Sequence, residues 1–188
     1  MNSFRIHAQA SAYDSPWTLA SRIKLLAWEL CWAVLCRWTP KPLNRWRVFW
    51  LGRFGATIHG RPFVHGRAAI VRPWNLTLHD RACLGDGAVA YCLDRIELHT
   101  GATLAQQAYL CAGTHDFDDP ATPLKTAPIV VGAHAFIGLR AVVLPGVTVG
   151  RGSLVGAGAV LSRDAQDWGI YAGVPARRIG TRRAFVQE

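Results

Sequence analysis

His115 and Asp94 are the two residues of this sequence whose types best suit proton-transfer chemistry. His115 lies in AGTHDFDDPATPLKTAP, a polar and proline-rich stretch that spans residues 112–128. An imidazole titrates near neutral pH, and a carboxylate beside it orients the ring and raises its basicity. Irregular excursions from a rigid scaffold are also where binding and catalytic residues concentrate. The stretch is therefore a candidate active site.

A six-residue repeat surrounds this stretch and must position it. Aliphatic residues recur at every sixth position after the excursion, at Val131, Ile137, Val143, Val149, Val155 and Leu161. This period suits neither a helix nor a simple alternating strand. It suits a coil of three short strands that turn on glycine and point their aliphatic side chains inward. The sequence therefore predicts an all-β solenoid.

The same repeat extends back to residue 58 and predicts about five coils. Its earlier aliphatic positions are Ile58, Val64, Ile70, Leu78, Leu84, Ala90, Leu98, Leu104 and Leu110. Residues 111–130 alone break the pattern, so we expect a loop excursion there. Counting one coil on from Ile96 reaches residue 116, which places Asp94 beneath Thr114 and within reach of His115. A corner acid paired with Arg95 is the alternative for Asp94.

Three histidines occupy one corner of this repeat. His59, His79 and His99 each follow an inward aliphatic residue at intervals of 20 residues. They are expected to form a ladder with rungs about 4.8 Å apart, which is the spacing of paired strands. A metal site is one interpretation, and a solvated corner or a subunit interface is the other; we expect no metal.

Composition and charge place the protein among cytoplasmic proteins with a basic front. The 188 residues carry a net charge of +9, and residues 1–79 hold eleven Lys and Arg but only two acids. Five Cys without metal-type spacing indicate free thiols in a reducing compartment. The first residues contain no apolar core of a signal peptide.

The segment before the repeat is predicted to be helical. Residues 1–14 are expected to form a loose arm, Ser15-Pro16 to open a helix that ends at Thr39-Pro40, and 42–54 to form a second helix. The predicted division is a cap over residues 1–57 and a β-helix domain over 58–188. Terminal coils need a cover, so these helices are expected to close the first coil.

The same helices suit a membrane surface. Residues 16–54 carry six of the eight Trp together with seven Lys and Arg, a combination typical of the membrane–water interface. The apolar run 25–36 is too short to span a bilayer, which takes about 20 residues. A cap alone and a cap with membrane or partner contact both remain open. No nucleic-acid-binding motif is present, and no nucleic acid is expected.

Four motifs resemble those of the hexapeptide-repeat acyltransferases, the left-handed parallel β-helix enzymes that use acetyl-CoA. They are GTHDF at 113–117, PIVVGAHAFIG at 128–138, LPGVTVGRGSLVGAGAVLSRD at 144–164 and AGVPARRI at 172–179. RPWNLTLHD at 72–80 and the Trp-rich front are most similar to acetyltransferases of colanic-acid and other exopolysaccharide biosynthesis, in the galactoside/maltose acetyltransferase group. The resemblance covers the chain from about residue 16.

The resemblance implies a direct acetyl transfer with His115 as general base. The base takes the proton of a sugar hydroxyl as the oxygen attacks the thioester, with a backbone N–H near Gly138 stabilising the oxyanion. It also implies a homotrimer with each site between two subunits, and a free or lipid-linked saccharide acceptor. By motif position, the residues implied to contact acetyl-CoA are Leu139, Ala157, Ser162, Arg163, Pro175 and Arg177.

Departures from the family pattern concern the acceptor side. Phe136 replaces a usual Trp, Arg163 replaces a Lys, and Val89 and Cys92 stand where polar residues are common. A carbonic anhydrase of the same coil would need an H-x4-H pair, which is absent. A non-catalytic scaffold and an acetyltransferase for another small hydroxyl or amine acceptor are the alternatives.

Overall fold

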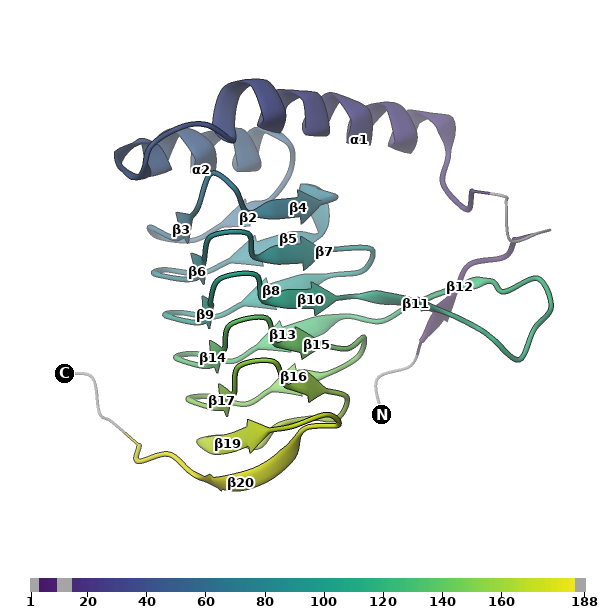
Figure 1. The fold of residues 1–188 in the computed structure, drawn as a ribbon. Coiled ribbons are helices and arrows are strands. Elements are labelled where there is room, and N and C mark those ends of the chain that lie inside the picture. The colour runs from purple at the N-terminus through teal and green to yellow at the C-terminus, as the bar shows by residue number, and fades with distance from the viewer. Residues whose placement is uncertain (1–3, 10–14, 185–188) are drawn as a thin grey trace.

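The computed structural model describes residues 4–9 and 15–184, which form a parallel β-solenoid covered at one end by helices (Figure 1). Three sheets run along the solenoid. The first contains β2 (Thr57–Ile58), β5 (Leu76–Leu78), β8 (Ile96–Leu98), β13 (Ile129–Val131) and β16 (Thr148–Val149). The second contains β3 (Phe63–Val64), β6 (Cys83–Leu84), β9 (Thr103–Leu104), β14 (Phe136–Ile137), β17 (Leu154–Val155), β19 (Gly169–Ala172) and the antiparallel β20 (Arg177–Thr181). The third contains β4 (Ala69–Val71), β7 (Val89–Tyr91), β10 (Tyr109–Cys111), β15 (Val142–Val143) and β18 (Val160–Leu161).

The predicted solenoid and its register are confirmed. Ile58 pairs with Leu78, which pairs with Leu98, and Val131 and Val149 continue the same row. The row that begins at Val64 and the row that begins at Ile70 run in parallel with it through the other two sheets. Because each row is buried inside the coils, the aliphatic residues form one continuous core. Within the described residues, five turns are complete and β19 begins a sixth.

Helices close the first coil, as expected for a terminal cover. They are α1 (Leu19–Cys31), a π-helical turn (Trp32–Cys36), a 3-10 turn (Lys41–Leu43) and α2 (Asn44–Arg53). Trp28 is 1% exposed and its indole N–H donates to the Ile70 carbonyl at 2.7 Å, and Trp32 donates likewise to Ala68 at 3.0 Å. These indoles satisfy carbonyls at the open end of the third sheet while they bury their rings.

The start of the first helix differs from the prediction. The N-cap is Thr18, whose hydroxyl accepts the Ser21 N–H at 3.3 Å, whereas the Ser15 hydroxyl accepts the N–H of Trp17 in a local turn. Ser15-Pro16 had the right residue types, but Thr18 offers the same hydroxyl one turn closer to the apolar run. No helix of the described residues is long and apolar enough to cross a membrane.

Arg47 holds the two helical segments and the first coil together. It is 0% exposed, and its guanidinium donates to the carbonyls of Val64, Pro40 and Lys41. It also donates to the Thr39 hydroxyl at 2.8 Å. Arg47 is one of the seven basic residues that the sequence analysis counted toward a membrane surface, and its burial excludes it from such a surface. The planar, fork-like arrangement of its donors explains why it serves several carbonyls at once.

The excursion from the third coil is a β-hairpin that a distant strand extends. β11 (Gly113–His115) pairs antiparallel with β12 (Leu124–Thr126), and β1 (Arg5–Ile6) pairs with the other edge of β12. Figure 1 shows the hairpin projecting sideways from the solenoid with β1 beside it. Residues 4–9 are therefore not a loose arm, because β12 offers them a sheet edge; residues 1–3 and 10–14 of the predicted arm lie outside the described residues.

Candidate active site

His115 ends β11 with its imidazole exposed and its tautomer fixed. Its Nδ1 lies 2.8 Å from the Thr122 carbonyl oxygen. A carbonyl oxygen can only accept, so Nδ1 carries the proton and the neutral ring keeps a lone pair on Nε2. On the opposite face of the hairpin, Lys125 pairs with Asp116 at 2.7 Å and holds the pKa of that carboxyl below its usual value through this hydrogen bond. Nε2 of His115 is thus a proton acceptor exposed to solvent, on a hairpin whose two strands are also joined by the Lys125–Asp116 ion pair.

Asp94 lies at the base of the hairpin rather than beneath His115. Ile96 pairs with Ile129, so the coil resumes only after the whole hairpin, and the predicted stacking of Asp94 under Thr114 is wrong. The predicted mapping counted hairpin residues as coil residues. In the described chain Asp94 shares no hydrogen bond or ion pair with His115; it is 7% exposed and accepts from the Thr126 hydroxyl at 3.0 Å and the Arg95 N–H at 2.8 Å.

His7 completes a hydrogen-bonded chain that the sequence did not predict. Its Nε2 lies 3.0 Å from the Thr126 hydroxyl, which already gives its proton to Asp94, so His7 donates. The His7 N–H donates to the Leu124 carbonyl and continues the pairing of β1 with β12. Burial, then the nearby Arg5, lowers the pKa of His7 from its ordinary value.

The register places both histidines on one face of the three-stranded sheet. Leu124 lies opposite His115 on one side and beside His7 on the other. Residues directly opposite each other in antiparallel strands point to the same face. The imidazoles of His7 and His115 therefore share a face with Thr126, two residues farther along β12, and with the carboxylate to which Thr126 donates.

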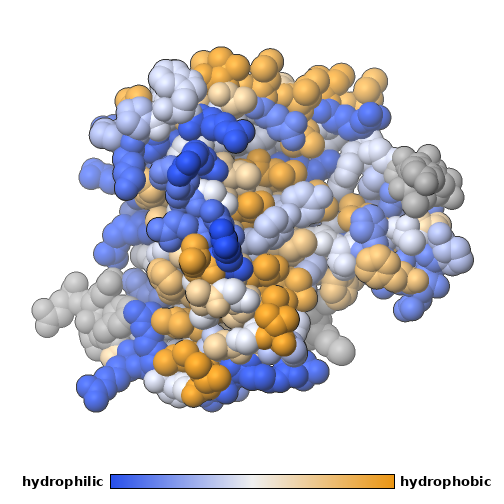
Figure 2. Space-filling model, viewed as in Figure 1, coloured by the Kyte–Doolittle hydropathy of each residue, from blue (hydrophilic) through white to orange (hydrophobic). Residues whose placement is uncertain are grey.

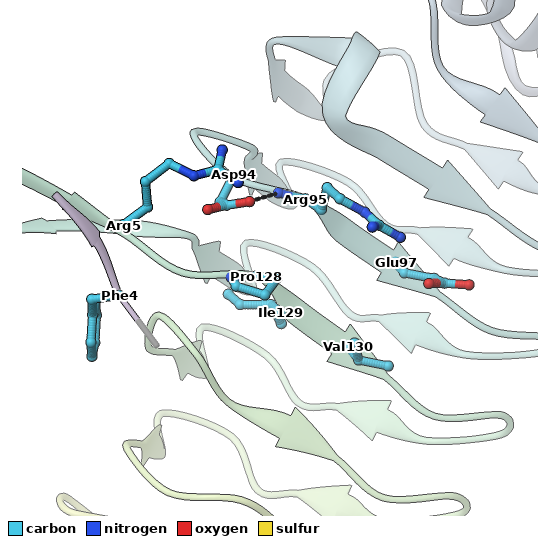
Figure 3. A pocket seen from close by; sticks show the side chains of 8 residues that line it. All are labelled: Phe4, Arg5, Asp94, Arg95, Glu97, Pro128, Ile129 and Val130. Carbon is cyan, nitrogen blue, oxygen red and sulfur yellow. Dashed lines mark hydrogen bonds between the residues drawn. The ribbon is translucent and has the colours of Figure 1, made fainter. Parts of the chain in front are cut away.

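A pocket of about 650 Å³ opens beside Asp94. Figure 3 shows Arg5 of β1 reaching toward Asp94, and Arg95 pointing toward Glu97 on β8. Phe4, Pro128, Ile129 and Val130 complete the lining. The pocket thus combines two guanidinium groups, two carboxylates and an apolar wall, a mixture that can bind the hydroxyl groups and ring faces of a polar ligand.

The residues implied to contact acetyl-CoA lie around β18, at two neighbouring corners of the last coils. Leu139 follows β14, and its carbonyl accepts the Gly158 N–H at 2.8 Å, so Ala157 lies one coil away at the same corner. Pro175 belongs to the turn after β19, and the adjacent Ala176 donates to the Val160 carbonyl of β18. Ser162 and Arg163 follow β18 at the next corner, and Arg177 begins β20. All six are exposed.

Leu139, Ala157, Pro175 and Arg177 lie at a different corner from His115, whereas Ser162 and Arg163 lie at the corner from which the hairpin leaves, two coils farther along the solenoid. The hairpin leaves the solenoid between β10 and β13, whereas Leu139 and Ala157 lie where the chain passes from the second sheet to the third. The structure brings Leu139, Ala157 and Pro175 together and leaves His115 on a separate projection. Within one chain, His115 therefore lies apart from the corner that holds Leu139, Ala157 and Pro175.

The predicted histidine ladder is present. The rings of His59, His79 and His99 stack with centroids 4.8 Å apart. Nε2 of His79 lies 2.7 Å from Oε1 of Glu97, and Nε2 of His99 lies 3.7 Å from the same oxygen. The hydrogen bond from His79 is the main cause that lowers the pKa of Glu97. Among the described residues, His79, Glu97 and His99 form the one group that could hold a metal. The three rings form a stacked ladder, and one oxygen of the Glu97 carboxylate lies near Nε2 of both His79 and His99.

The sequence interpretation missed His7, Thr126 and Arg5. Phe4-Arg5-Ile6-His7 alternates apolar and polar residues, which is a strand signal over four positions. A strand that short is not distinguishable from a loop without knowledge of the edge it joins. Thr126 gave no signal of its own.

Comparisons with known proteins agree with this architecture. A family model described as "Hexapeptide repeat of succinyl-transferase" matches residues 128–163. The "Putative colanic acid biosynthesis acetyltransferase WcaF" of Escherichia coli (strain K12) is 37% identical over 135 residues, which cover 72% of this chain and 74% of that protein.

Two solved structures share the fold. A galactoside acetyltransferase in complex with coenzyme A superposes with a TM-score of 0.80 at 19% identity, covering 90% of this chain and 86% of that one. A maltose O-acetyltransferase from Clostridium difficile 630 superposes with a TM-score of 0.76 at 18% identity, covering 89% and 90%.

Proposed function

The chain belongs to the hexapeptide-repeat acetyltransferases, and from that premise we propose that it transfers an acetyl group from acetyl-CoA to a saccharide hydroxyl in exopolysaccharide biosynthesis. The observation that carries the proposal is the His115 imidazole, whose protonated Nδ1 leaves Nε2 free to accept a proton. The relative WcaF, named for colanic acid biosynthesis, supports the acceptor class.

His115 acts as general base in this proposal. Nε2 removes the proton of the acceptor hydroxyl while its oxygen attacks the thioester carbonyl of acetyl-CoA. The imidazolium that forms keeps its Nδ1–H bond to the Thr122 carbonyl, so the ring does not reorient during the step. As the C–S bond breaks, His115 returns the proton to the departing thiolate. The products are the acetyl ester and free CoA thiol.

The acceptor binds beside the same face of the hairpin. The pocket at Asp94 lies at the base of β12, and Arg5 and Arg95 offer donors to sugar oxygens there. Asp94 is a positioning residue in this proposal. Its carboxylate fixes Thr126, and Thr126 fixes His7 in the row that contains His115.

The exposed corners around β18 suit acetyl-CoA, which supplies the activated acetyl group. A Cβ on Gly158 would meet nothing within 4 Å, so the corner beside Ala157 is open to an extended ligand. Arg163 and Arg177 have exposed guanidinium groups that can pair with phosphates. Leu139 and Pro175 add apolar contacts, and Ser162 adds a hydroxyl.

A complete site takes two subunits of a homotrimer in this proposal. His115 projects from one corner, whereas Leu139, Ala157, Pro175 and Arg177 surround another, and in this proposal a neighbouring subunit brings the two halves together. A trimer closes such a heterologous contact with three equivalent sites.

We place the enzyme in the cytoplasm, at the inner face of the membrane, with a lipid-linked saccharide as the favoured acceptor. The whole excess of positive charge precedes residue 80, and anionic lipids of the cytoplasmic leaflet attract such segments.

Release of CoA thiol tests the proposal. Purified protein with acetyl-CoA and a panel of hydroxyl acceptors is expected to release thiol with at least one saccharide, and His115→Ala is expected to remove that activity. If acetyl-CoA binds but no hydroxyl or amine acceptor yields thiol above the hydrolysis background, the proposed acetyl transfer is wrong. If acetyl-CoA does not bind either, the solenoid is a non-catalytic scaffold.

A further inference from the structure

The helical cap has a second apolar face that points away from the solenoid. Five aliphatic residues on it are between 55% and 69% exposed: Leu19, Ile23, Leu26, Leu30 and Val34. Successive residues of a helix are about 100° apart, so these positions form one stripe along α1 and the following turn. Trp28 and Trp32 lie on the opposite side of the helix, buried against the first coil. The cap is therefore apolar on two faces.

Large apolar side chains are also exposed beyond α1. Further large apolar side chains with 42% to 72% exposure lie in the turns and in α2: Trp38, Leu43, Trp46 and Phe49. Figure 2 shows apolar side chains gathered along the outer edge of the molecule, over α1. Single exposed apolar residues are ordinary on soluble proteins, but a contiguous stripe of this length marks a contact surface.

Positive charge surrounds the stripe. Arg22, Arg37, Lys41, Arg45 and Arg53 are all exposed on the same helical segments. Glu29 is the only acid between residues 15 and 79. A two-fold interface brings the same patch of both subunits together. A second copy of this face would therefore bring positive charges against positive charges, which repel each other. The charges instead complement an anionic surface.

A basic groove lies beneath α2, next to the stripe. Its volume is about 770 Å³, and Arg45, Arg53 and Arg61 line it together with Phe49 and Ile58. No carboxylate lines it, and the three guanidinium groups have no hydrogen-bond or ion-pair partner among the residues that the structure describes. Guanidinium groups bind phosphate oxygens in pairs, and the apolar wall suits the adjoining glycerol and acyl chain.

We propose that this face docks on an anionic phospholipid bilayer, with the aliphatic stripe inserted at the level of the headgroups and a lipid phosphate in the groove beneath α2. The helix lies in the plane of the interface, as amphipathic helices with basic flanks do. Arg47, Trp28 and Trp32 take no part, because they hold the cap to the solenoid. The contact is made by aliphatic residues and unpaired arginines.

Co-sedimentation of the full chain with vesicles tests this docking without acetyl-CoA or an acceptor, so its outcome is independent of the proposed acetyl transfer. Binding is expected to vesicles of phosphatidylcholine with phosphatidylglycerol, and to weaken as salt rises. Phosphatidylcholine alone is expected to bind less. If the wild-type protein stays in the supernatant with phosphatidylglycerol vesicles at low salt, the proposal is overturned.

Two pairs of variants locate the contact. Leu26→Gln with Leu30→Gln is expected to weaken binding roughly 10-fold or more, because both side chains would leave the interface. Arg45→Gln with Arg53→Gln is expected to weaken it about 30-fold, since each basic residue near an anionic surface contributes about a factor of five. These residues are exposed, so the fold is expected to be retained.

Matched controls lie in the last coils and the tail. Arg151→Gln with Arg183→Gln removes the same charge, and Ile179→Gln replaces an equally exposed aliphatic residue. Both are expected to bind as the wild type does. Equal losses in the control and helix variants would overturn a contact at the cap. If the Leu26 and Leu30 variant instead changes the sedimentation coefficient of the free protein, the face packs on another copy and not on lipid.

Discussion

The hydrogen bond from His115 Nδ1 to the Thr122 carbonyl gives the imidazole a defined role at the residue scale. We expect His115→Ala to lower acetyl transfer about 10²–10⁴-fold, which is the usual effect of losing a general base. Acetyl-CoA affinity is expected to change little, because His115 lies on the projecting hairpin and the proposed acetyl-CoA residues lie on the last coils. Steady-state thiol release and equilibrium binding of acetyl-CoA measure the two effects. A variant with wild-type turnover would remove His115 from the mechanism.

Asp94 is expected to affect turnover through position rather than through proton transfer. In Asp94→Asn, the remaining oxygen can accept the Arg95 N–H, and Thr126 can accept from the new amide. Turnover is therefore expected to fall less than in His115→Ala, with an unchanged fold by circular dichroism. Thr126→Val serves as the matched variant, because it breaks the same link from its other end. Unchanged rates and pH profiles in both variants would make this link purely structural.

The sequence predicted the contacts of individual residues less well than it predicted the fold. His115 and Asp94 were both named, but the stacking that related them was wrong, since the register of an excursion cannot be counted from the coil. The carbonyl partner of His115 and the link through Thr126 depend on backbone pairing between distant segments. The type of a residue does not predict which distant strand its backbone pairs with.

At the scale of elements, the pairing of β1 with β12 is expected to depend on pH. His7 has a lowered pKa in the folded protein, so its contribution to docking is complete above its unfolded pKa of about 6.5 and is lost as the pH falls through the folded value. The groups around it are Arg5, Asp94 and Arg72. The protection factor of the amide at position 7, which is the intrinsic exchange rate divided by the observed rate, is expected to fall on acidification, and to fall less in His7→Asn. A protection factor that does not depend on pH in the wild type would contradict this linkage.

The helical cap is expected to depend on Arg47 for its stability. Arg47→Met keeps the apolar stem but leaves several carbonyls without donors, and we expect a loss of about 2–4 kcal/mol in the free energy of unfolding. Arg45→Met, at an exposed position of the same helix, is the control and is expected to change it by less than about 0.5 kcal/mol. Urea unfolding followed by Trp fluorescence measures both. Equal stabilities would show that water replaces the guanidinium at no cost.

The sequence predicted the elements better than the residues, because their signals are periodic. The six-residue repeat predicted the inward rows of the solenoid, and the breaker at Thr39-Pro40 separated the two helices. Which Trp and Arg side chains face inward was not predictable, since the helices are apolar on two faces and either could cover the coil.

At the scale of the whole molecule, the proposed active site requires assembly. The protein is expected to sediment as a trimer with three times the 20.6 kDa mass of the chain. Mixing His115→Ala subunits with subunits that carry Arg177→Ala is expected to restore part of the activity, because some interfaces then contain two intact halves. A monomer at micromolar concentration, or mixtures without any recovery, would contradict a shared site.

The docking of β1 on β12 also orders events in time. His7 and Thr126 are 119 positions apart, and translation at roughly 5–20 residues per second takes about 6–24 s to cover that distance. The cap and the first three coils can form meanwhile, since their contacts lie within residues already synthesised. For this interval β1 has no edge to join, and the face that holds His7 and His115 does not exist. The proposed catalytic face thus forms on the nascent chain only after the segments of the cap and the first three coils, and before the fourth and fifth coils are synthesised.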